Sequence, residues 1–168
     1  MNRFRLWVLA GIVTSALPQP AIAVVAVHSI GAAIEKNGLK IEPHYLTGIE
    51  MGGMLMDEVH LEADVHATKG EPHGFPEGAW IPYLTIKYTL TKDGTSSKAT
   101  GTLAAMIAKL GPHYAADVQM SGPGNYQLTY EISPPSPQAM KPHTDPDIGV
   151  PPWWKPFSLH WTFNYPDH

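Results

Sequence analysis

The 168-residue sequence contains no cysteine. No disulfide can therefore cross-link the fold, which must depend on an ordinary hydrophobic core. Cysteine-ligated zinc sites, iron–sulfur clusters and covalently attached haem are excluded, as is a blue-copper electron-transfer centre, because each requires cysteine sulfur. We also expect no lipoprotein anchor, which needs a cysteine at the cleavage point. Any metal site must be built from His, Met, Asp or Glu.

The N-terminus has the pattern of a secretory signal peptide. Arg3 and Arg5 precede an apolar stretch from Leu6 to Leu17, which is too short to span a bilayer as a stable helix. Ala21-Ile22-Ala23 then matches a small-residue cleavage site. We expect cleavage after Ala23, export to the periplasm and a single domain over residues 24–168. The alternative for this segment is an uncleaved membrane anchor.

Charged residues are few, at 15% of the chain, and acidic residues predominate. Removing Arg3 and Arg5 with the leader leaves nine basic residues against fifteen acidic ones, a net charge of −6. This balance argues against nucleic acid or an anionic membrane surface as a partner and suits a protein that attracts cations. No serine nucleophile motif, phosphate-binding loop or small-molecule substrate site is evident.

Beyond the leader, helical periodicity is scarce, and short alternating runs are separated by Gly and Pro. Asp93-Gly94 is typical of a hairpin turn. About seven strands at this spacing favour an antiparallel β-sandwich over a barrel or a βαβ fold. The predicted strands are Leu39–Leu46, Met56–Ala67, Trp80–Leu90, Ala99–Ala108, His113–Met120, Asn125–Ser133 and Phe157–Tyr165.

Two segments are predicted to be loops, Lys69–Gly78 and Pro134–Pro152. The second contains seven prolines, which restrict the backbone and make it stiff. Such a loop suits the presentation of a side chain at a fixed place.

One predicted strand has an unusual polar face. Alternation places His60, Glu62, Asp64 and His66 in one row, about 6–7 Å apart. Two histidines and two carboxylates in a row are typical of ligands for a transition metal. The alternative is a solvent-exposed face that happens to be rich in histidine, and the row alone does not decide between them.

Other segments add soft and nitrogen ligands. Met106 comes near the end of one predicted strand and His113 begins the next, so a short hairpin would bring them together. His143 lies in the proline loop. A site of His, Met and Glu is expected to take copper well, but copper heads the divalent affinity order, so bound copper would not identify the cargo. Met51, Met54 and Met56 also cluster in the sequence, but simple packing is the favoured explanation for them.

Several long motifs resemble the periplasmic high-affinity Fe²⁺ transport family, also called the 34-kDa membrane-antigen family. They cover nearly all of the chain after the leader. They are the 30–51 segment with its Glu35-Lys36-Asn37-Gly38 turn, Val59–Ala67, Gly74-Phe75 through Trp80–Leu84, Gly111–Tyr114, Gly124–Tyr126, His143–Asp145, Gly149-Val150 and Trp154–Phe157.

The resemblance implies an immunoglobulin-like β-sandwich that forms homodimers and assists iron uptake through an inner-membrane iron permease. It implies that copper is bound near the dimer interface by His60, Glu62, Met106, His113 and His143. Ferrous or ferric iron is the implied second metal. From strand geometry, Asp64 and His66, with Met51 as a weaker candidate, are predicted for an iron-type site.

Two other functions remain open from the sequence. One is a periplasmic copper- or zinc-homeostasis protein without a role in iron. The other is a metal-free adhesion or scaffold domain. Copper-dependent Fe²⁺ oxidation is a further option, but we expect little turnover, because nothing indicates an oxygen-reducing multi-copper cluster.

Overall fold

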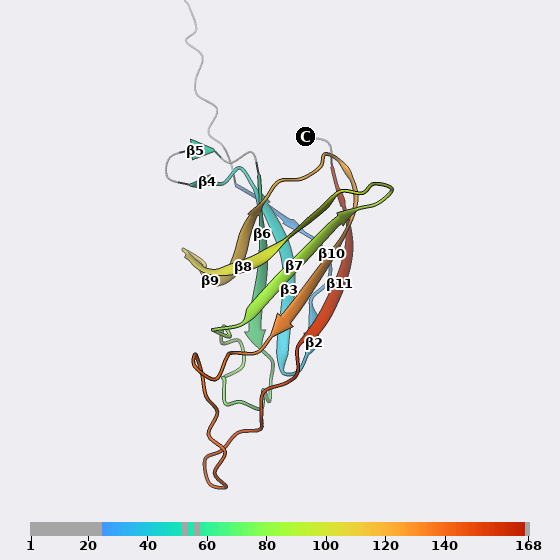
Figure 1. Cartoon of the computed structure of the whole chain (residues 1–168). Coiled ribbons are helices and arrows are strands. Elements are labelled where there is room, and N and C mark those ends of the chain that lie inside the picture. The colour runs from blue at the N-terminus through green and yellow to red at the C-terminus, as the bar shows by residue number, and fades with distance from the viewer. Residues whose placement is uncertain (1–24, 52–53, 56–57, 167–168) are drawn as a thin grey trace, which may run out of the picture.

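The computed structural model describes residues 25–51, 54–55 and 58–166, and every regular element in this part of the chain is a β-strand (Figure 1). Within these residues, no helix has the length and apolar character needed to cross a bilayer. The strands are β1 Ala26–Ser29, β2 Ile34–Lys36, β3 Leu39–Thr47, β4 Glu50–Met51, β5 Met54–Leu55, β6 Val59–Ala67, β7 Thr85–Lys92, β8 Lys98–Ala108, β9 Gly111–Val118, β10 Gly124–Ser133 and β11 Phe157–Tyr165.

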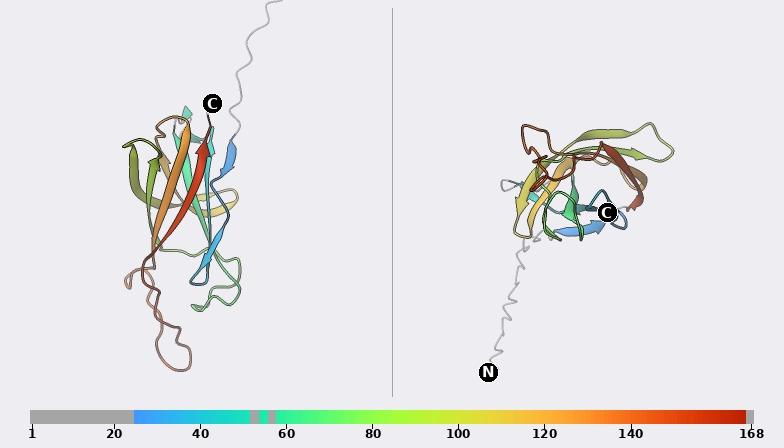
Figure 2. Two further views of the ribbon diagram at one scale, coloured as in Figure 1. Left: turned by 90° about the vertical axis from the view of Figure 1, so that its right-hand side faces the viewer. Right: turned by 90° about the horizontal axis from the view of Figure 1, so that it is seen from below.

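The long strands form one antiparallel sheet that folds over on itself. Its order is β1-β3-β6-β9-β8-β7-β10-β11, with β2 paired to β3, while β4 and β5 form a separate hairpin. The sheet turns from one half to the other along β8, because the first half of β8 pairs with β7 and its second half pairs with β9. Viewed from below, the strands wrap around a common interior (Figure 2).

The core lies between the two halves of this sheet. Residues of the long strands fill it, among them Ile41, Leu61, Ile86, Leu128 and Ile132, which are almost fully buried. Hydrogen bonds also cross the interior: the Tyr130 hydroxyl donates to the Glu62 carbonyl at 3.0 Å, and Trp161 Nε1 donates to the Ala32 carbonyl at 2.9 Å. The backbone of the strand that carries His60 and Glu62 is thus supported from the opposite half.

The prediction of an antiparallel β-sandwich is confirmed, and β3 and β6–β11 correspond to the seven predicted strands. The segment from Trp80 starts as a strand only at Thr85. Pro82 has no N–H to donate, and Tyr83 adopts a φ of 63°, so the ladder cannot begin earlier. The strands β1, β2, β4 and β5 are not predicted from the sequence, because they are too short for alternation to show. The predicted signal peptide over residues 1–23 lies outside the described residues.

The two predicted loops lie at one end of the sandwich. The segment after β6 and the segment between β10 and β11 extend from the same end, where β6 finishes (Figure 1). They touch there, because His73 Nε2 lies 3.4 Å from the Pro152 carbonyl oxygen. The start of β6 is at the opposite end of the sandwich.

Candidate metal centre

The first half of the polar row on β6 is buried. His60 is 5% exposed and Glu62 is 8% exposed, whereas Asp64 and His66 are only partly buried. The residues around them come from the end of β3, the segment that follows it and the β8–β9 hairpin. Together they line an open cavity formed by Leu46, Ile49, His60, Glu62, Ala105, Met106, Ile107, Ala108 and His113. Because histidine and glutamate are rarely buried without partners, this half of the row is not an ordinary solvated strand face.

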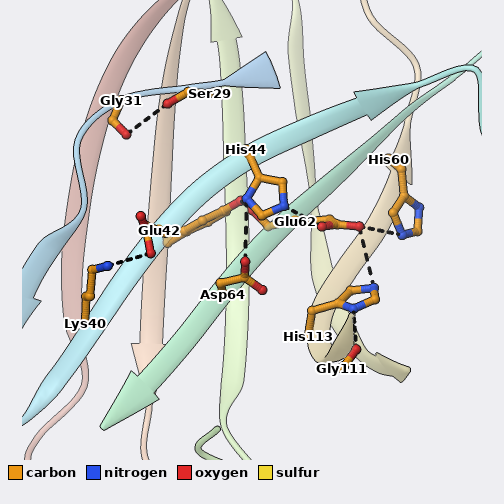
Figure 3. Close-up of polar contacts among 11 residues, drawn as sticks. Ser29, Gly31, Lys40, Glu42, His44, His60, Glu62, Asp64, Gly111 and His113 are labelled. Carbon is orange, nitrogen blue, oxygen red and sulfur yellow. Dashed lines mark hydrogen bonds and ion pairs between the residues drawn. The ribbon is translucent and has the colours of Figure 1, made fainter. Parts of the chain in front are cut away.

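Two imidazoles converge on one carboxylate oxygen in this cavity (Figure 3). His60 Nε2 lies 3.5 Å from Glu62 Oε1, and His113 Nε2 lies 3.6 Å from the same oxygen. One potential ligand atom from each of the three residues lies within 4.8 Å of the other two. The distances are longer than hydrogen bonds, and they leave space for an ion that would contact all three atoms.

The other nitrogen of each ring is held by an acceptor. His60 Nδ1 lies 2.6 Å from Asp117 Oδ1, and His113 Nδ1 lies 3.3 Å from the Gly111 carbonyl oxygen. When Nδ1 donates its proton to such an acceptor, the lone pair of the neutral ring is on Nε2, which faces Glu62. Proteins commonly orient metal-binding histidines in this way.

Glu62 has a second set of contacts on its other side. Its Oε2 lies 2.5 Å from His44 Nε2, and His44 Nδ1 lies 3.9 Å from Asp64 Oδ2. Burial alone would raise the pKa of Glu62, but the His44 hydrogen bond and the charges of His113, His44 and His60 lower it. Burial opposes protonation of His44, yet Glu62, Asp64 and Glu42 raise its pKa. Glu62 is therefore an ionised carboxylate at neutral pH.

Met106 lies beside this cluster because of the β8–β9 register. Met106 is directly opposite His113 in the antiparallel pair, and both residues line the cavity. This is the short hairpin that the sequence predicts. The cavity lining thus includes a residue with a soft thioether sulfur, which matters for the choice of metal.

His143 does not lie in this cavity. It belongs to the segment between β10 and β11, which packs at the end of the sandwich where β6 finishes, whereas His60 is at the start of β6. His60 and Ala67 are seven residue steps apart along the strand, which corresponds to about 23 Å. The His143 side chain is 73% exposed, and its Nδ1 lies 3.8 Å from Asp145 Oδ2.

The residues predicted for an iron-type site lie on two elements, Asp64 and His66 on β6 and Met51 on β4. Asp64 faces His44, and His66 forms an isolated β-bridge with Trp80. Met51 pairs with Met54 in the small β4–β5 hairpin. Across residues 25–51, 54–55 and 58–166, His60, Glu62 and His113 form the one group of three or more His, Asp or Glu side chains with converging ligand atoms. The Asp64, His66 and Met51 site therefore stays a prediction.

Sequence reasoning missed two residues that hold the cluster, His44 and Asp117. Each lies across a strand pair from its partner, since His44 is opposite Glu62 and Asp117 is opposite His60. Alternation along Leu39–Leu46 does place His44 on a polar face with Lys40 and Glu42. Only the strand order could show that this face adjoins Glu62.

The fold and the cluster together define an antiparallel β-sandwich protein with a buried histidine–carboxylate group suited to a transition metal. Comparison of the sequence with known protein families identifies the family. The Fe²⁺ transport protein family matches residues 25–167, so the chain belongs to that family.

Individual proteins are also similar to this chain in sequence or in structure. The chain is 40% identical over 137 residues to a UPF0423 protein of Brucella abortus (strain 2308), covering 76% of this chain and 75% of that protein. Copper-reconstituted P19 of Campylobacter jejuni is 42% identical, with a TM-score of 0.77 over 83% of this chain and 96% of that one. FetP of uropathogenic Escherichia coli strain F11 is 45% identical, with the same TM-score and the same coverage of each chain.

Proposed function

We propose that this chain is a periplasmic metal-binding protein of iron uptake that holds copper and passes iron, its cargo, to an inner-membrane iron permease. The copper ligands are His60, Glu62, Met106 and His113, with His143 supplied by a second copy of the chain. The observation that carries the proposal is the convergence of His60 Nε2 and His113 Nε2 on Glu62 Oε1, while Nδ1 of each ring is held by an acceptor.

The donor set fits copper. Two imidazole nitrogens and a carboxylate suit Cu²⁺, and the neighbouring thioether of Met106 suits Cu⁺. Asp117 and the Gly111 carbonyl orient the two rings, and His44 orients Glu62. Bound copper would supply a structural ion or a one-electron redox centre beside the iron cargo.

Two features support a second copy as the source of His143. The His143 loop is at the far end of its own chain's sandwich, so it cannot close over its own cavity without a large rearrangement. The β8–β9 hairpin beside the cavity also exposes apolar side chains, with Ile107 82% exposed and Leu110 100% exposed. Exposed apolar surface of this kind is typical of an interaction site. A homodimer would cover this hairpin and bring a second proline loop to the cavity.

The relatives support the location and the cargo. The family is described as an Fe²⁺ transport protein family, and the relative FetP was crystallised after expression in the periplasm. Both agree with the predicted signal peptide and with the acidic charge of the mature chain. The permease partner is proposed from the same iron-transport role.

Metal analysis and growth together test the proposal. Protein purified from the periplasm is expected to contain copper, and a deletion strain is expected to grow poorly when iron is limiting. Normal growth under iron limitation, with sensitivity to copper or zinc excess or to zinc shortage, would instead support a copper- or zinc-homeostasis protein. If the purified protein contains no metal and binds no copper on titration, the result would support a metal-free adhesion or scaffold domain.

Copper affinity is expected to fall as pH drops below about 6–6.5, because imidazole must be neutral to bind a metal. The pKa of Glu62 is held below its usual range, so this carboxylate stays ionised and adds nothing to the change there. Competition titrations with a chelator of known pH dependence, from pH 5 to 8, measure the effect. A flat profile would contradict histidine ligation.

Mixed dimers test the sharing of ligands between copies. We expect His113→Ala and His143→Ala homodimers each to bind copper weakly. In a heterodimer of the two variants, the cavity of the His113→Ala subunit lacks both its own His113 and the partner's His143. The cavity of the His143→Ala subunit keeps its own His113 and receives His143 from its partner. Copper titration of tagged heterodimers should therefore recover one tight site per dimer. Recovery of no tight site would contradict the sharing.

A further inference from the structure

A buried carboxylate–imidazole pair lies outside the candidate metal centre, in the segment after β6. The side chains of Glu71 and His73 are 0% and 4% exposed, and Glu71 Oε1 lies 2.6 Å from His73 Nδ1. Glu71 Oε2 accepts hydrogen bonds from the backbone N–H groups of His73 at 2.8 Å and Phe75 at 3.1 Å. A buried carboxylate with three such partners fixes the local backbone and the plane of the His73 ring.

His73 connects this pair to the proline loop. Its Nε2 lies 3.4 Å from the Pro152 carbonyl oxygen, and its ring stacks on Trp153 with centroids 4.1 Å apart and planes at 19°. Trp153 Nε1 donates to the Met140 carbonyl at 3.3 Å. A continuous series of contacts therefore runs from the Glu71 carboxylate to Met140, three residues before His143.

The outer part of the loop is closed by its own hydrogen bonds. Val150 N donates to the His143 carbonyl at 2.9 Å, and Gly149 N donates to the Asp145 carbonyl at 2.9 Å. A Cβ added to Gly149 would lie 2.2 Å from the Asp145 carbonyl oxygen, so the turn leaves no room for a side chain there. His143 is thus carried on a compact turn whose root is held by Trp153.

We propose that Glu71, His73 and Trp153 form a positioning clamp that sets where the proline loop presents His143. The inference rests on the proposed function, in which His143 completes the copper site of a second copy. None of the three residues contacts the metal. They act through the loop, because a stiff segment fixed at its root carries its tip to one place, whereas a freed root lets the tip move.

The clamp is tested with substitutions that break successive contacts. His73→Ala removes both the stack and the Pro152 contact. Trp153→Phe keeps an aromatic ring but loses the N–H that reaches Met140, and it guards against misfolding of the first variant. Glu71→Gln is the conservative variant, because its amide oxygen still accepts from the two backbone N–H groups. His160→Ala, an exposed histidine on β11, is the matched control.

Three readouts separate positioning from general damage. The first is copper affinity of the full-length dimer by chelator competition. The second is the number of nitrogen ligands in the electron paramagnetic resonance spectrum of the Cu²⁺ form. The third is thermolysin cleavage of metal-free protein before Ile148, which is 68% exposed in the loop. Circular dichroism and light scattering establish that each variant is folded and dimeric.

We expect His73→Ala and Trp153→Phe to weaken copper about 10-fold, the lower end of the range for supporting residues. They should also lose one nitrogen from the spectrum and speed cleavage at Ile148, whereas Glu71→Gln and His160→Ala match the wild type. Folded His73→Ala and Trp153→Phe proteins with unchanged cleavage and unchanged spectra would overturn the clamp. A His143→Ala dimer that binds copper as tightly as the wild type would instead overturn the ligand role of His143 itself.

Discussion

Replacement of His60 or His113 by alanine is expected to weaken copper binding by about 100-fold or more, which corresponds to about 2.7 kcal/mol. Residues that merely support a ligand typically cost 10–100-fold, so removing a ligand should reach at least the upper end. Each of these imidazoles directs Nε2 toward Glu62 Oε1, and they are the two histidines among the described residues that line the cavity. Chelator-competition titration of metal-free protein measures the loss.

His66→Ala is the matched control for His60→Ala, since His66 lies on the same face of β6 but outside the cluster. Its copper affinity should equal that of the wild type. Equal affinities for the wild type and a folded His60→Ala or His113→Ala protein would contradict the assignment of the cavity as the copper site. Parallel losses in His60→Ala and His66→Ala would contradict a site confined to the start of β6.

The Trp161→Ala substitution is expected to reduce the free energy of unfolding by about 3–5 kcal/mol, the usual range for removal of a buried tryptophan. Trp161 is 7% exposed and packs edge-on against Tyr130, with ring centroids 5.6 Å apart. Its Nε1 donates to the Ala32 carbonyl at 2.9 Å, so the variant also removes a hydrogen bond between β11 and the N-terminal segment. Urea denaturation of metal-free protein measures the loss.

Trp161→Phe serves as the control, because it keeps an aromatic ring but loses the N–H donor. It should cost less than Trp161→Ala, by the packing that the ring retains. At low temperature, where Trp161→Ala remains folded, its copper affinity should stay near that of the wild type, since Trp161 lines no part of the cavity. A loss of stability below about 1 kcal/mol would contradict the role of Trp161 in joining the two halves of the sheet.

The long strands could be predicted because their information is local. In β10 and β11, apolar and polar residues alternate, and this alternation matches the more buried and more exposed sides that the structure shows. In β6 the sequence alternates in the same way, but the polar residues His60 and Glu62 are buried as well. The short strands β1 and β2 carry too few residues for a period to appear, and they exist because β3 offers an edge for pairing. The apolar content of Trp80–Leu90 predicts a longer strand than β7, because residue types do not reveal the positive φ of Tyr83 that delays the strand to Thr85.

Some features of the candidate site also follow from local sequence, whereas others depend on distant strands. The spacing of His60 and Glu62 follows from the period of a strand, and the meeting of Met106 with His113 follows from a short hairpin. The partners His44 and Asp117 are 18 and 57 residues away from the residues that they contact. Contacts of this range depend on which strands pair and in which register, and single-sequence patterns do not specify that.

Residue types and their alternation were enough to indicate a cysteine-free β-sandwich, the kinds of metal ligand available and the strand that carries two of them. Tertiary structure alone decided that His60 and Glu62 are buried, that their free atoms face one another, and that His143 is far from them in the same chain. The physical reason is that burial and hydrogen-bond partners arise when a long sheet folds over on itself along β8. A local pattern limits which face a side chain takes, but only distant strands determine what covers that face.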